Sequence, residues 1–137
     1  MKEKPKEKPK LLIVEDDQWF RKSLEVVLKK YFDIDQAGSE DKALELLAEK
    51  DYLIVSTDGA FPKHEGGYVG NHGVLHDSDY RGNTVAKAAK EKGSFVIGLS
   101  TEPERLTEPH IIMSKKGLDL MFHVNYLKQV VERLDYE

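Results

Sequence analysis

Leu-Leu-Ile-Val-Glu-Asp-Asp, residues 11–17, is an apolar run of four residues that stops at three consecutive carboxylates. Four consecutive apolar residues are typical of a strand buried on both faces of a parallel sheet. A second such run, residues 52–57, ends at Asp58 and is followed by Pro62. If both strands lie in one parallel sheet, their acidic ends meet at the same edge. The carboxyl groups gathered there repel one another unless a hard cation lies among them.

The rest of the chain alternates predicted helices and strands. Phe20, Leu24, Val27, Leu28 and Tyr31 recur at the spacing of one helical face after the first strand. Further strands are predicted at 34–37, 94–100 and 111–114, and further helices at 39–49, 82–92 and 118–134. Strict alternation predicts an α/β fold, a doubly wound five-stranded parallel sheet with helices on both faces.

The flavodoxin-like strand order 2-1-3-4-5 places the predicted ligand crevice. In that order the topological switch point lies between the first and third strands, where ligands bind beyond the carboxyl ends. These are the strands that end in Glu15-Asp16 and in Asp58. The position of the acids and the position of the crevice therefore agree.

Composition narrows the classes of function. The chain has 137 residues, the size of one domain, and its net charge is −4. Without the first ten residues, the chain has 16 basic and 23 acidic side chains, so this part is acidic and we expect no nucleic-acid partner. No apolar run is long enough to span a membrane. The absence of cysteine excludes disulfides and thiolate chemistry and fits a cytoplasmic location. We expect a disordered basic tail at 1–10 and one domain at 11–137 with a long insert at about 62–81.

Four motifs, in order along the chain, resemble the receiver domain of two-component response regulators. Residues 11–17 resemble its first strand with the acidic pair, and Asp58 with Pro62 resembles its phosphoacceptor aspartate and the proline four positions later. Residues 95–100 resemble its fourth strand, which ends here in Ser100, and residues 111–115 resemble its fifth strand with the lysine, here Lys115. The resemblance covers nearly all of residues 10–135, in a single-domain form like that of the chemotaxis receivers.

The resemblance implies a Mg²⁺-dependent phosphoacceptor in phosphorelay signal transduction rather than a classical enzyme. Asp58 would accept a phosphoryl group from a sensor histidine kinase or phosphotransfer protein. Mg²⁺ would be held by Glu15, Asp16, Asp58 and the backbone carbonyl near Ala60, while Ser100 and Lys115 would contact the phosphoryl group. The expected partners also include an unidentified downstream protein, and the expected state is a monomer or weak dimer without membrane association.

Several alternatives remain open on the sequence. Lys116 competes with Lys115 as the site lysine, because a shift of one residue turns a strand side chain to the other face. A pseudo-receiver, which binds proteins without being phosphorylated, and a Mg²⁺-dependent phosphohydrolase are rival functions. The insert, with His64, His72 and His76, is expected to be a surface loop, with transition-metal binding or partner docking as other interpretations.

Overall fold

The computed structural model describes residues 7–70 and 74–135. Its sheet has five parallel strands in the order β2-β1-β3-β4-β5. The strands are β1 (Lys10–Val14), β2 (Asp33–Ala37), β3 (Ile54–Asp58), β4 (Phe95–Ser100) and β5 (Ile111–Ser114). The predicted fold class and strand order are therefore confirmed. The expected tail falls largely on residues 1–6, which lie outside the described residues.

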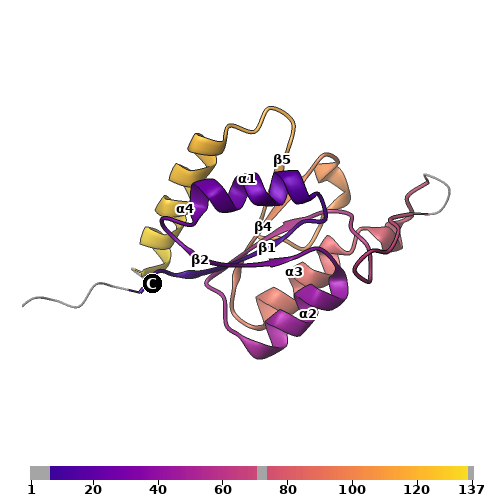
Figure 1. The fold of residues 1–137 in the computed structure, drawn as a ribbon, viewed down its shortest axis with the longest axis horizontal. Coiled ribbons are helices and arrows are strands. Elements are labelled where there is room, and N and C mark those ends of the chain that lie inside the picture. The colour runs from indigo at the N-terminus through magenta and orange to yellow at the C-terminus, as the bar shows by residue number, and fades with distance from the viewer. Residues whose placement is uncertain (1–6, 71–73, 136–137) are drawn as a thin grey trace, which may run out of the picture.

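Helices cover both faces of the sheet (Figure 1). They are α1 (Gln18–Leu28), α2 (Glu40–Glu49), α3 (Gly82–Glu91) and α4 (Leu120–Asp135), with short 3₁₀ turns η1 (Asp77–Asp79) and η2 (Pro103–Arg105). Figure 1 shows α1 and α4 on one face and α2 and α3 on the other. None of the helices among the described residues is long and apolar enough to cross a membrane.

Strand alternation divides the core into two layers, because successive side chains point to opposite faces. Leu11 and Ile13 of β1 pack with Leu24 and Leu127 under α1 and α4. Leu12 and Val14 pack in the other layer, under α2 and α3. All of these side chains are at most 1% exposed, and burying each one contributes about 1.5–3 kcal/mol.

Carboxylates fix the start of two helices. The side chain of Asp17 accepts hydrogen bonds from Trp19 N at 3.0 Å and from Phe20 N at 3.2 Å and so caps α1. Asp119 caps α4 in the same way, so this helix begins at Leu120 rather than at residue 118. Trp19, in the first turn of α1, is 85% exposed.

The insert runs along the carboxyl edge of the sheet, where it projects from the molecule (Figure 1). The backbone carbonyls of Pro62 and Lys63 accept hydrogen bonds from the first two amides of α2, at 3.0 and 2.9 Å. Its other described limb, residues 74–81, contains η1 and leads into α3. The connection between β4 and β5 contains a single turn, η2, as the short polar segment predicted.

Candidate functional site

The acidic strand ends meet as predicted. Carboxylate oxygens of Glu15, Asp16 and Asp58 all lie within 4.8 Å of one another. Glu15 follows β1, is 3% exposed, and is held by its amide, which donates to Ala37 O at 2.9 Å. Asp16 is exposed, whereas Asp58 ends β3 and is partly buried. The cluster is thus buried on one side and open to solvent on the other.

Lys115 is the lysine that lies among these acids. Its Nζ is 2.7 Å from Glu15 Oε2 and 3.0 Å from Asp58 Oδ1, and it also lies over the Phe20 ring, 4.8 Å from the centroid. Lys115 is two residues after Met113, so its side chain points to the same face of the sheet, and Met113 packs under α1 and α4. Lys116, the next residue, points to the other face and is exposed. Its backbone amide, not its ammonium, makes a bond here, to Ser114 Oγ.

Crowding of like charges changes the protonation of the cluster. Burial, followed by the charge of Asp58, raises the pKa of Glu15 to about 8. The same two causes raise the pKa of Asp16. Burial by itself would lower the pKa of Lys115, but the charges of Asp58 and Glu15 outweigh it and raise that pKa. The cluster therefore favours a positive charge in its midst.

The two carboxylate oxygens of Asp58 have different surroundings. Oδ1 accepts a hydrogen bond from Gly59 N at 2.7 Å and pairs with Lys115 Nζ. Within the described part of the chain, no hydrogen bond or ion pair engages Oδ2. One oxygen is therefore anchored, and the other keeps its lone pairs for a ligand or an electrophile.

Asp58 opens into a hollow of about 380 Å³ at the carboxyl edge of the sheet. Asp16, Ala60, Ser100 and Lys115, four of the predicted site residues, line it together with Asp58. Ser100 ends β4 and is 3% exposed, and its Oγ accepts a hydrogen bond from Glu102 N at 3.0 Å. The structure thus brings together every residue predicted for the site, apart from the open alternative Lys116.

Two glycines permit the close packing behind Asp58, and sequence reasoning assigned neither of them this role. A Cβ on Gly59 would lie 2.7 Å from Ser100 Oγ, and a Cβ on Gly82 would lie 2.2 Å from Asp58 O. Real Cβ atoms do not approach other atoms so closely, so a side chain at Gly59 would displace Ser100, and Gly82, which faces backbone, must be glycine as the backbone stands. Gly82 had been predicted only as a helix start, and its real constraint comes from a contact 24 residues away in sequence.

The insert supplies the remaining wall of the hollow. Val69 and Leu75 contribute apolar side chains, and Tyr80 is buried between the insert and β4. Tyr80 was missed as a site neighbour in the sequence, because nothing in its spacing links it to Asp58. Among the described residues, neither His64 nor His76 belongs to a group of three potential metal ligands, and His72 lies outside the described residues.

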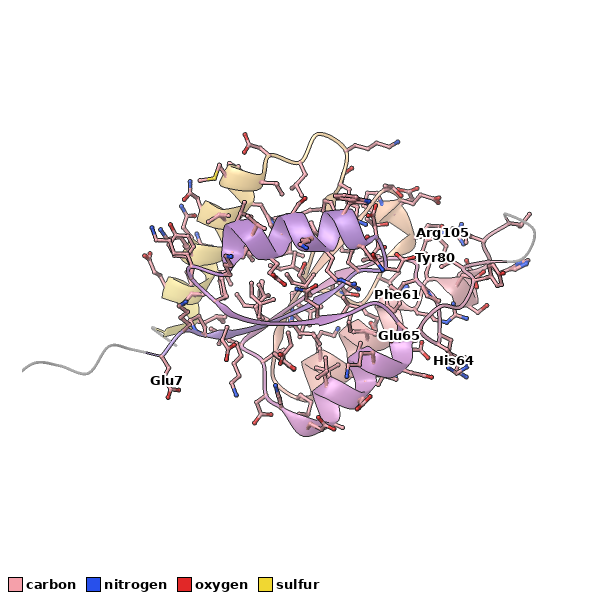
Figure 2. The ribbon with its side chains drawn as sticks, in the orientation of Figure 1. Glu7, Phe61, His64, Glu65, Tyr80 and Arg105 are labelled. Atoms are coloured by element: carbon pink, nitrogen blue, oxygen red, sulfur yellow. The ribbon has the colours of Figure 1, made fainter. Side chains whose placement is uncertain are left out.

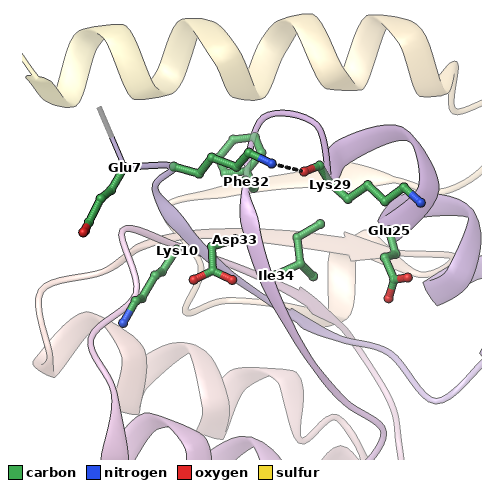
Figure 3. Close-up of a pocket in the computed structure, with 8 residues that line it drawn as sticks. Glu7, Lys10, Glu25, Lys29, Phe32, Asp33 and Ile34 are labelled. Carbon is green, nitrogen blue, oxygen red and sulfur yellow. Dashed lines mark hydrogen bonds between the residues drawn. The ribbon is translucent and has the colours of Figure 1, made fainter. Parts of the chain in front are cut away.

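A larger hollow, of about 810 Å³, lies at the opposite, amino end of the sheet (Figure 3). Lys10, Lys29, Glu25 and Asp33 line it with charges of both signs, and the side chain of Lys8 donates a hydrogen bond to Lys29 O. It contains none of the predicted site residues. Its mixed charges and open shape give it no chemistry comparable to that of the acidic cluster.

The donor set of the cluster suits a hard divalent cation. Carboxylate oxygens are the ligands that Mg²⁺ takes from proteins, and it keeps several waters, which the exposed side of Asp16 allows. Burial, followed by the charge of Asp58, raises the pKa of Glu15 and of Asp16, and a bound cation would favour the ionised form of both carboxyl groups. The residues therefore fit a hard divalent cation such as Mg²⁺.

Several solved structures of similar fold are described as receiver domains. The signal receiver domain of an HD domain-containing protein from Pseudomonas fluorescens Pf-5 aligns with a TM-score of 0.71 and 19% identity, over 96% of this chain and 100% of that one. A CheY-like receiver domain from Methylobacillus flagellatus aligns with a TM-score of 0.68 and 20% identity, over 90% and 99%. The BeF3-activated DrrB receiver domain aligns with a TM-score of 0.70 and 17% identity, over 92% and 99%.

Sequence comparison adds nothing to this likeness. No protein-family model matches the chain, and no curated protein matches it. These structural matches cover 90–96% of the chain. The strand order of this chain places the acidic cluster at the switch point. This chain has the fold of the response regulator receiver domains.

Proposed function

We propose that this chain is a phosphoacceptor signalling module in which Asp58 receives a phosphoryl group from the phosphohistidine of a sensor histidine kinase or phosphotransfer protein. The observation that carries the proposal is the arrangement of Asp58, whose Oδ1 is anchored by Lys115 and Gly59 while Oδ2 is left for attack. Two further carboxylates stand beside it. The resemblance of the motifs and of the fold to receiver domains supports the same assignment.

The proposed transfer uses residues that already line the hollow. Oδ2 of Asp58 forms a bond to phosphorus while the bond from phosphorus to the donor imidazole breaks and returns its electron pair to the nitrogen. Lys115 and the Ser100 hydroxyl then lie where they can bind phosphoryl oxygens. Glu15, Asp16, Asp58 and the Ala60 carbonyl would hold Mg²⁺, which offsets the repulsion between the acids and the incoming phosphoryl group.

The test is intact-mass spectrometry after incubation with Mg²⁺ and acetyl phosphate. We expect a single phosphoryl adduct that Asp58→Asn abolishes. Asp33→Asn is the matched control, because it makes the same chemical change at the opposite end of the sheet and should leave the adduct intact. Absence of an adduct in the wild type would instead favour a phosphorylation-independent protein-binding module. Sustained release of phosphate from small phosphoesters would favour a phosphohydrolase.

A further inference from the structure

Tyr80 joins the insert to the segment that follows β4. It is 4% exposed, and its hydroxyl donates a hydrogen bond to Glu102 Oε2 at 2.9 Å. The guanidinium of Arg105 lies over the ring, 4.5 Å from its centroid, and also pairs with Asp77 at the start of η1. Figure 2 shows Tyr80 and Arg105 side by side at the end of the molecule opposite Glu7. The tyrosine is therefore held from both sides in one position.

Glu102 is the acid that this arrangement controls. It lines the same hollow as Asp58, and its amide is bonded to Ser100 Oγ at 3.0 Å. The other acids that line the hollow, Asp16 and Asp58, already have roles in the proposed phosphoacceptor site. Glu102 is left as the carboxylate in this lining that has no role in that site. Its neighbours on the insert side, Val69 and Leu75, are apolar and cannot take a proton from water.

We propose that Tyr80 sets the lifetime of the phosphoryl group by holding the Glu102 carboxylate away from the attacking water. In hydrolysis, water oxygen bonds to phosphorus, the bond from phosphorus to Asp58 breaks, and Asp58 leaves as a carboxylate. The water proton passes to a nearby base, which a released Glu102 would provide. The Tyr80 hydroxyl binds Oε2 and so fixes the orientation of the carboxylate, which keeps Oε1 from turning toward the water, and the phosphorylated form persists. Tyr80 is then a positioning residue, and the inference rests on the proposed function.

The experiment measures the first-order loss of the adduct by intact mass in Mg²⁺ after acetyl phosphate is removed. Tyr80→Phe keeps the ring and removes the hydroxyl, and should speed the loss about tenfold, below the ~10²–10⁴ of a fully positioned base. Glu102→Gln in the wild-type background should change the rate less than about twofold, because that carboxylate is already withdrawn. The double variant Tyr80→Phe/Glu102→Gln should return to the wild-type rate.

The double variant separates positioning from simple sealing of the hollow. If it decays as fast as Tyr80→Phe alone, the hydroxyl only excludes water and the proposal is wrong. An unchanged or slower decay of Tyr80→Phe overturns it as well. If Tyr80→Phe fails to fold, Arg105→Gln replaces it, because Arg105 holds the same ring. Its adduct should also decay faster than that of the wild type, and adding Glu102→Gln should return the decay to the wild-type rate. If the wild type forms the adduct but the variants decay at the rates that contradict the proposal, only this inference is wrong. If the wild type forms no adduct, the proposed function is wrong as well.

Discussion

The ammonium of Lys115 lies 3.0 Å from Asp58 Oδ1 and 2.7 Å from Glu15 Oε2. It therefore bridges the ends of three strands, since Lys115 follows β5, Asp58 ends β3 and Glu15 follows β1; β3 lies beside β1, and β4 separates it from β5. The bridge neutralises part of a cluster that would otherwise repel itself. Stability and the proposed phosphoacceptor chemistry would consequently depend on the same ammonium group, and the two dependences can be measured separately.

Lys115→Gln should lower the free energy of unfolding by about 2 kcal/mol in Mg²⁺-free buffer. This is less than the ~3–5 kcal/mol typical of breaking a buried pair, because Glu15 can bind a proton instead. Lys116→Gln, the matched control at an exposed neighbour, should change it by less than about 0.5 kcal/mol. Urea titrations of both variants provide the measurement, and an equal loss in Lys116→Gln would assign the site to the other lysine. Added Mg²⁺ should return part of the stability lost in Lys115→Gln.

The raised pKa of Glu15 predicts a dependence of stability on pH. Between its ordinary pKa of 4.5 and its folded value of about 8, the folded state binds a proton that the unfolded state releases. Stability contributed by this group therefore falls as pH rises through that window, by at most about 1.4 kcal/mol per pH unit. The raised pKa of Lys115 contributes no slope there, because that lysine is charged in both states well below 10.5.

The difference between wild type and Glu15→Gln isolates this effect. We expect urea titrations in EDTA to show the advantage of the variant growing from about pH 5 to about pH 8. Mg²⁺ should flatten the wild-type slope because it competes with the proton for the same oxygens. A difference that stays constant across the window would mean that Glu15 is ionised throughout.

His123 predicts the opposite slope at lower pH. It is 1% exposed, and neither ring nitrogen has a hydrogen-bond partner among the described residues. Burial lowers its pKa below the ordinary 6.5, so the unfolded state binds more protons and stability falls as pH drops below about 6.5. His123→Leu should remove this loss and be more stable than the wild type at acid pH. The same comparison above pH 7 is the control, and a constant difference between the two would contradict the argument.

The sequence made the acidic cluster predictable because each acid ends an apolar run. Parallel strands bring their carboxyl ends to one edge, so Glu15, Asp16 and Asp58 meet whatever the details of packing. Ser100 and Lys115 follow from the same rule applied to β4 and β5. Only the choice between Lys115 and Lys116 needed coordinates, because β5 is short and a shift of one residue would exchange their faces.

Contacts between loops were not predictable in the same way. Tyr80 and Glu102 are 22 residues apart and lie in segments without periodicity, so no pattern pairs them. The role of Gly82 depends on how closely α3 approaches the end of β3, which a helix signal cannot reveal. The insert had no strand or helix signal of its own, and its anchoring comes from single polar contacts.

Gly82→Ala should be strongly destabilising. Its Cβ would lie 2.2 Å from Asp58 O, and backbone can yield only by moving α3 away from β3. We expect a loss of about 3 kcal/mol in urea titration, at the upper end of overpacking costs, and slower phosphorylation by acetyl phosphate. Thr84→Ala, an exposed change in the same helix, should stay within about 0.5 kcal/mol. A Gly82→Ala protein as stable as the wild type would show that the helix start has room to move.

Asn83 holds the segment between β4 and β5 against α3. Its Oδ1 accepts from Thr107 N at 2.8 Å and from Glu108 N at 3.2 Å, and its Nδ2 donates to Arg105 O at 3.2 Å. These bonds satisfy backbone groups of a segment that contains only one helical turn. Asn83→Ala leaves them unpaired and should cost about 2 kcal/mol.

Amide hydrogen exchange gives the sharper measurement of this role. Protection of the Thr107 and Glu108 amides should fall in Asn83→Ala and persist in Asn83→Asp, which keeps the acceptor oxygen and loses only the donor. Asn125→Ala, the same change at an exposed position of α4, is the matched control and should leave both amides protected. If both amides stayed protected in Asn83→Ala, packing of Leu106 and Pro109 against Gly98 would be enough to hold the segment. These two side chains lie close to Gly98, 2.8 and 3.0 Å from the position that a Cβ would take there.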